Sequence, residues 1–259
     1  MGHIRLGQLP RSRRWQYVIG LIAEGSAPAG AIAQAIAEAA DARLLQVGKD
    51  PGVAYLYWLL TRVTWHARND NFAEALRSDG IRVEGAPDGL RFLAEVGEAA
   101  AREVRHRGTT TAFTEIALRA FRETLGRAVE QRARTLFGVS GADVQRALRE
   151  LSTQTQFAGL ARGFFSSFLG GVLRFVSSKE TSNHVGWTRA FLDSSAAASF
   201  EAELGAFAHQ TTKILEDFSG EWYSKHNWLG DITPRESQRF VEHALRKLRT
   251  ELSISQGEQ

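Results

Sequence analysis

Apolar side chains recur every three or four residues along nearly the whole chain, which is the spacing of one face of an α-helix. The most apolar stretch runs from 154 to 177, with Phe157, Phe164 and Phe168 on one side. We therefore predict an all-α multi-helix bundle of about nine or ten helices. The predicted helices cover 12–24, 28–47, a stretch beginning at Pro51, 72–77, 89–106, 110–136, a stretch after Ser140, 154–177, 197–224 and 234–252.

Residues that favour the first turn of a helix occur at the predicted helix starts. Ser140 is followed three residues later by Asp143, an N-cap residue with an acid at its third position. Thr233 and Pro234 open the last helix in the same way, as an N-cap followed by proline at the first helical position. Residues 178–195 are rich in Ser, Thr and Asn, and we expect a connection there.

Residues 78–89 form the clearest interruption of the helical pattern. They contain three glycines, a proline and the short alternating pair Ile81 and Val83, which is consistent with a linker, a loop or a minor β-excursion. A linker would divide the chain into an N-terminal helical region, 1–79, and a main helical bundle, 90–259. The alternative is one continuous domain.

The positive charge of the chain is concentrated at its N-terminus. Residues 1–23 contain four arginines and no acid, so the charge of this segment alone exceeds the formal net charge of +3 for the whole chain. Arginine outnumbers lysine 27 to 5, which GC-rich bacterial codon usage would explain; selection for guanidinium contacts to phosphate or carboxylate is the alternative. The arginines of this basic arm are Arg5, Arg11, Arg13 and Arg14.

A second basic segment lies in the predicted helix 110–136. Its arginines alternate with acids such as Glu115 and Glu123, so many of them are expected to form intrahelical ion pairs in solvent. If the protein binds nucleic acid, these side chains and the arm are expected to contact phosphates without reading bases. The candidate nucleic-acid-binding residues are Arg5, Arg11, Arg13, Arg14, Arg119, Arg122 and Arg127.

Known catalytic and cofactor motifs are missing from the sequence. With no cysteine there is no thiol nucleophile and no zinc–thiolate site. Gly48-Lys49 lacks the earlier glycine of a phosphate-binding loop, and Ser140 fits a helix cap better than a nucleophile elbow. The seven histidines form no pair at metal-binding spacing. We expect no catalytic residue, cofactor or metal, and neither a membrane-spanning segment nor a secretory signal, which favours the cytoplasm.

The segment 221–228 is the least ordinary stretch of the chain, because three large aromatic rings and two basic groups fall within eight positions. Such a cluster can be a hot spot for a protein partner or a stacking surface for a nucleobase. The simpler interpretation is structural, with the rings closing the end of a helical core. The candidate partner-binding residues are Trp222, Tyr223, Lys225, His226 and Trp228.

These observations favour a non-enzymatic accessory or scaffold subunit that docks onto partner proteins, in a bacterial assembly for nucleic-acid handling or antiviral defence. One alternative is an autonomous, sequence-nonspecific nucleic-acid-binding protein that uses the N-terminal arm. A second is a helical enzyme whose carboxylate and histidine site the motifs do not reveal. Self-association into a homo-oligomer stays open.

Overall fold

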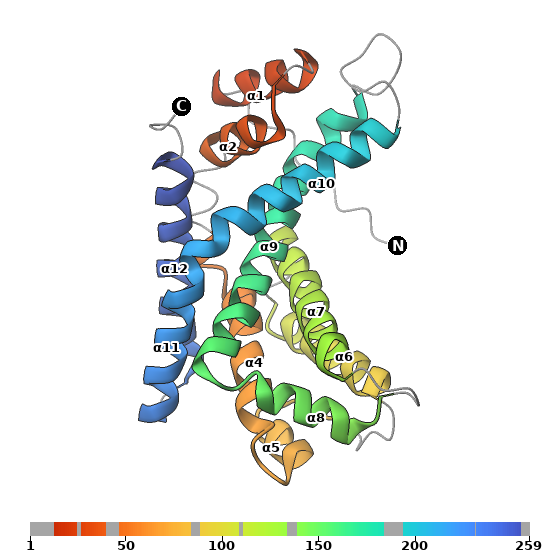
Figure 1. The fold of residues 1–259 in the computed structure, drawn as a ribbon, viewed down its shortest axis with the longest axis vertical. Coiled ribbons are helices and arrows are strands. Elements are labelled where there is room, and N and C mark those ends of the chain that lie inside the picture. The colour runs from red at the N-terminus through yellow and green to blue at the C-terminus, as the bar shows by residue number, and fades with distance from the viewer. Residues whose placement is uncertain are drawn as a thin grey trace.

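A computed structural model of the protein describes residues 13–24, 27–39, 47–83, 89–108, 111–133, 139–183, 194–230 and 232–254. All regular structure in these ranges is helical, which confirms the predicted all-α multi-helix bundle (Figure 1). The helices are α1 (Arg13–Glu24), α2 (Ala29–Ala39), α4 (Pro51–His66), α5 (Phe72–Ser78), α6 (Gly89–His106), α7 (Ala112–Arg132), α8 (Gly141–Glu150), α9 (Gln154–Asn183), α10 (Ser194–Thr211), the 3₁₀ turn η1 (Thr212–Ile214), α11 (Leu215–Leu229) and α12 (Pro234–Ile254).

Several predicted helix boundaries differ from the structure, and two of these differences change an element. Helix α9 continues to Asn183, six residues beyond its predicted end at 177 and into the expected connection, whose remainder, 184–193, lies outside the described residues. The single helix predicted over 197–224 is broken by η1. The Thr212 hydroxyl donates to the carbonyls of Ala208 and His209, at 2.9 and 3.1 Å. Such back-bonding competes with the helical hydrogen-bond ladder and accompanies tight turns of this kind.

The segment after α5 is a helix cap and not a strand. Gly80 adopts φ +82°, and its amide donates to Arg77 O. The amide of Ile81 donates to Leu76 O at 3.0 Å, which completes a Schellman motif. Ile81 and the following Val83 are both buried. Their alternation therefore reflects two apolar side chains that cover the core after a left-handed glycine.

Helix α9 forms the centre of the bundle and packs against α7, α10 and α11 (Figure 1). Helices α1 and α2 lie at one end of the molecule, and α5 and α8 at the other. One buried apolar cluster extends from Val18 to Leu248, and α4 packs against both α7 and α12. Described residues on both sides of 84–88 thus contribute to a shared core.

Aromatic rings fill the core where α4, α9, α11 and α12 meet. The buried Tyr57 ring of α4 lies 5.4 Å from Phe165 and 4.9 Å from Phe240, centroid to centroid. Trp222 of α11 approaches the same ring at 5.8 Å. The phenylalanines that the sequence pattern placed on one side of α9, including Phe157, are buried here. Each such ring contributes a large apolar area and a further contact energy from ring geometry.

An ionic clamp joins the end of α4 to the end of α5. Arg62 donates to both carboxylate oxygens of Asp79, at 2.5 and 3.2 Å, and His66 Nε2 lies 2.6 Å from Asp79 Oδ2. The Arg62 guanidinium also covers the Trp65 ring at 4.4 Å. Trp65 and His66 therefore have structural roles in this clamp.

The clamp makes stability depend on pH. Burial acts to raise the pKa of the Asp79 carboxyl, but hydrogen bonds from His66 and Arg62 outweigh burial and hold it below its ordinary value of 3.8. The stabilisation is therefore complete above pH 3.8 and is lost as pH falls through the lower folded-state pKa. We expect Asp79→Asn to lower the free energy of unfolding by about 2 kcal/mol at neutral pH. In urea titrations this difference should shrink below about pH 4; a constant difference would contradict the assignment.

Helices α7 and α9 approach closely at Gly171, where a Cβ atom would lie 2.5 Å from Ile116 Cγ2. We expect Gly171→Ala to destabilise the protein by about 1–3 kcal/mol, because a β-branched neighbour cannot move aside. Gly126, inside α7, is the matched control, because a Cβ there meets no atom within 4 Å. Gly126→Ala should be neutral or stabilising by up to about 1 kcal/mol. Equal thermal unfolding shifts for the two variants would refute this packing argument.

Candidate docking surface at the end of helix α11

Helix α11 separates the predicted aromatic cluster into an inner and an outer half. Residues three or four apart share a face of a helix, so Trp222, Tyr223 and His226 fall on one side. Lys225 and Trp228 fall on another. The structure therefore does not bring the five candidate residues onto a common surface.

The inner half belongs to the core. Tyr223 is 1% exposed and stacks on Phe157 with ring centroids 3.9 Å apart. Burial raises the pKa of its hydroxyl. Trp222 is half-buried and packs 4.7 Å from Phe240, and His226 lies 4.9 Å from the Trp222 ring. Tyr223 cannot contact a partner from this position, and the structural interpretation holds for it and for most of Trp222.

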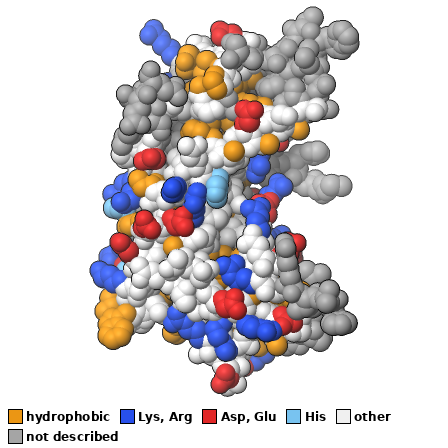
Figure 2. All heavy atoms as spheres, viewed as in Figure 1, with side chains coloured by type: hydrophobic (Ala, Val, Ile, Leu, Met, Phe, Trp, Pro, Cys, Tyr) orange, Lys and Arg blue, Asp and Glu red, His pale blue; other side chains and the backbone are white. Residues whose placement is uncertain are grey.

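The outer half faces solvent. The Trp228 side chain is 88% exposed, and the neighbouring Leu229 is 56% exposed. Helix α11 ends immediately afterwards at Gly230, whose left-handed φ of +66° lets its amide donate to Asn227 O. Figure 2 shows hydrophobic side chains gathered at this end of the helix. The cap fixes the backbone under the exposed ring, so the ring projects from an ordered helix end.

Arg68 contacts this helix end, and Arg149 is bonded to the same turn that carries Arg68. Arg68, in the turn after α4, donates to Asn227 Oδ1 at 3.3 Å and to Ser152 Oγ at 2.8 Å. Arg149 of α8 donates to Ala67 O at 3.0 Å. These acceptors are neutral, so the hydrogen bonds position the guanidinium groups without cancelling their charge.

We call this region the Trp228 corner, and its members come from α11, α8 and the turn after α4. Acids also lie on these elements, among them Glu150 and Glu221. Neither forms an ion pair with the arginines or lysine of the corner within the described ranges. Figure 2 shows Lys and Arg side chains gathered over the lower part of this face, next to the hydrophobic patch. The Trp228 corner consists of Arg68, Arg149, Lys225, Trp228 and Leu229.

The candidate nucleic-acid-binding arginines of the arm are only partly described. Arg5 and Arg11 lie outside the described residues. Arg13 and Arg14 are exposed on α1, and Arg14 donates to the backbone carbonyl of Glu38 at 3.2 Å. Because α1 packs on α2 at one end of the molecule, these arginines lie away from the exposed end of α11 (Figure 1).

The three candidate arginines of α7 differ in their surroundings. Arg119 forms an ion pair with Glu123 at 2.9 Å, as the alternation of charges predicts. Arg122 donates to Gly97 O and pairs with Glu98 at 2.8 Å. Arg127 is exposed. Of these three arginines, Arg127 is therefore the one that forms no ion pair with a described acid.

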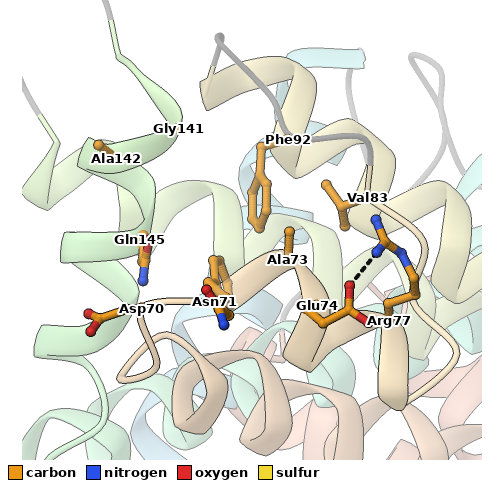
Figure 3. Close-up of a pocket in the computed structure, with 11 residues that line it drawn as sticks. Asp70, Asn71, Ala73, Glu74, Arg77, Val83, Phe92, Gly141, Ala142 and Gln145 are labelled. Atoms are coloured by element: carbon orange, nitrogen blue, oxygen red, sulfur yellow. Dashed lines mark hydrogen bonds and ion pairs between the residues drawn. The ribbon is translucent and has the colours of Figure 1, made fainter.

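A hollow of about 640 Å³ lies between α5, α6 and α8 (Figure 3). Its floor is the core itself, because Phe72 and Phe92 are almost fully buried. Of its polar groups, Glu74 pairs with Arg77, and Gln145 donates to Asn69 O at 2.8 Å. Asn71 makes no side-chain cap hydrogen bond to α5.

Within the described part of the chain, no group of three His, Asp or Glu side chains is arranged to hold a metal ion. None of the described helices has both the length and the apolar composition to cross a membrane.

Three residues of the Trp228 corner were not among the sequence candidates. The membership of Leu229 could be predicted from the helical repeat, because Leu229 lies one turn after Lys225 on the same face of the helix. Arg68 and Arg149 reach the corner through contacts between distant segments, for which the sequence carries no local signal. Comparisons with protein-family models, with curated proteins and with solved structures found no match to this chain.

Proposed function

We propose that the protein is a non-enzymatic docking subunit that acts in the cytoplasm and binds an acidic surface of a partner protein through the Trp228 corner. The observation that carries the proposal is the 88% exposure of the Trp228 side chain at an ordered helix end. Solvent-exposed tryptophan is uncommon, and tryptophan is strongly enriched among the residues that dominate binding energy at interfaces.

The charges at the corner support an acidic occupant. Lys225 lies on α11, Arg68 contacts Asn227 of the same helix, and Arg149 is bonded to the turn that carries Arg68. None of the three forms an ion pair with a described acid. Complementary charge at an interface rim steers association and selects the partner. A second copy of this chain would place like charges against each other, so a homodimer through this corner is disfavoured.

The experiment compares tagged wild-type protein with Trp228→Ala after capture from the cells that produce it, with nuclease added. Tyr17→Ala is the matched control, because Tyr17 is also exposed, at 62%, but lies on α1. Proteins that disappear with Trp228→Ala and remain with Tyr17→Ala are the expected result, and acidic candidates among them should then bind the purified chain. Identical protein sets for all three samples would contradict the proposal.

The nuclease treatment also tests the nucleic-acid alternative. That alternative predicts that captured material is released by nuclease and by salt, because its contacts would be to phosphates. Its candidate arginines on α1 and α7 are spread over separate parts of the bundle (Figure 1). We therefore place it second.

A further inference from the structure

The groove between α7 and α9 contains a hollow of about 460 Å³. Its floor is a stretch of α9 with little side-chain bulk, since Gly159 and Gly163 lie there. Thr124, Arg127 and Arg132 of α7 line it on one side. Sites for small molecules commonly have volumes of roughly 300–1,000 Å³. The hollow is therefore large enough for a small organic ligand.

The hollow carries positive charge that the described residues do not balance. Arg132 donates to two neutral oxygens, Ala128 O at 3.2 Å and Gln156 Oε1 at 2.6 Å. Arg127 has no carboxylate partner in the described ranges. Glu216 also lines the hollow, but Arg162 holds its carboxylate at 2.7 Å. Two guanidinium groups thus face the hollow without a counter-charge.

A buried hydroxyl group also lacks a partner there. Thr124 is 6% exposed, and its Oγ1 atom makes no hydrogen bond to the described residues. Buried polar groups in folded proteins are nearly always hydrogen-bonded, and an unpartnered one costs stability. Because this oxygen is closed to water in the ligand-free protein, its hydroxyl reaches an acceptor on a ligand only if the side chain turns toward the hollow. The two guanidinium groups therefore carry the argument for an anionic ligand.

We propose that this hollow binds a small phosphate-bearing molecule. Guanidinium groups donate two parallel hydrogen bonds to phosphate oxygens, and Arg127 and Arg132 both line the hollow. The glycine floor allows a ligand to approach the α9 backbone, because a Cβ at Gly159 would meet no atom within 4 Å. No Phe, Tyr or Trp side chain lines the hollow in the described ranges, although the His209 imidazole does, so recognition rests on the phosphate and not on stacking against a large ring.

Isothermal titration calorimetry at low salt tests the proposal with inorganic pyrophosphate and ribose 5-phosphate as probes. We expect Arg127→Gln/Arg132→Gln to weaken binding by about tenfold or more, because each arginine loses charged hydrogen bonds. Gly159→Gln should block the hollow without disturbing the fold. The matched controls are Arg102→Gln/Arg105→Gln on α6, with the same charge change, and Gly126→Gln on α7. Both should bind as the wild type does, and thermal unfolding verifies that every variant is folded.

Four results with small molecules would overturn the proposal: absence of binding by both probes, equal weakening in the arginine controls, unchanged binding in folded Gly159→Gln, or tighter binding of citrate, which would assign the site to carboxylates. An oligothymidine strand tests the macromolecular source of phosphate. If it binds more tightly than pyrophosphate and also loses affinity in Arg127→Gln/Arg132→Gln, the groove holds a nucleic-acid backbone and the small-ligand proposal fails.

Discussion

Replacing Asp50 by alanine is expected to lower the free energy of unfolding by about 3–5 kcal/mol, because the change removes a helix cap and strands buried donors. Asp50 is 8% exposed and caps the start of α4, accepting from the amides of Gly52 and Val53 at 2.8 and 3.1 Å. The same carboxylate accepts from the hydroxyl groups of Thr114 and Thr111, at 3.0 and 2.6 Å. One side chain therefore joins the starts of α4 and α7.

Asp50→Asn separates the contribution of charge from that of shape. Asparagine keeps the oxygen that three of the four donors require, so its loss of stability should be clearly smaller than that of Asp50→Ala. Guanidinium chloride titrations with global fits of both variants measure the difference. Equal losses, or a loss below about 1 kcal/mol for alanine, would mean that the carboxylate does not organise the two helix starts.

Trp228→Ala is expected to weaken binding to the proposed acidic partner by about 2–4 kcal/mol, which corresponds to roughly 30-fold to 1,000-fold in Kd. The physical reason is that an exposed indole loses its water contacts only in the complex, so its apolar area contributes to association and little to folding. The same variant should change the free energy of unfolding by no more than about 0.5 kcal/mol. Biolayer interferometry and urea unfolding measure the two quantities.

Charge variants at the same corner should act differently. Lys225→Ala and Arg68→Gln remove long-range attraction, so they should mainly slow association and reduce its dependence on salt. Tyr17→Ala serves as the control with another exposed aromatic ring, on α1, and should bind normally. If Trp228→Ala bound the partner as tightly as the wild type does, the indole would have no part in the interface.

Much of the fold could be predicted because local signals and packing agree. The helix predicted over 89–106 has those bounds in the structure, and Ser140 and Asp143 form the predicted capping box. The helix predicted over 197–224 is interrupted at Thr212. The hydroxyl of this threonine bonds to the preceding turn of the helix, and the spacing of hydrophobic residues does not reveal such a bond.

The candidate docking surface could be predicted only in part. Once α11 is known, the helical repeat places Tyr223 and Trp228 on different faces of the helix. Which face points into the core depends on contacts with other helices, such as the stacking of Tyr223 on Phe157 of α9. Arg68 joins the corner through Asn227, 159 residues further along the chain. Such pairings arise from tertiary packing, and the chain near either residue gives no sign of them.

The most direct test of the docking proposal is a photoreactive phenylalanine analogue placed at position 228 and, as a control, at position 17. Irradiation of cells that make each protein, followed by mass spectrometry, reports what lies against each side chain. We expect a specific adduct at 228, formed with an acidic segment of a partner protein, and no such adduct at 17. The absence of any adduct at 228, or the same adducts from both positions, would contradict it.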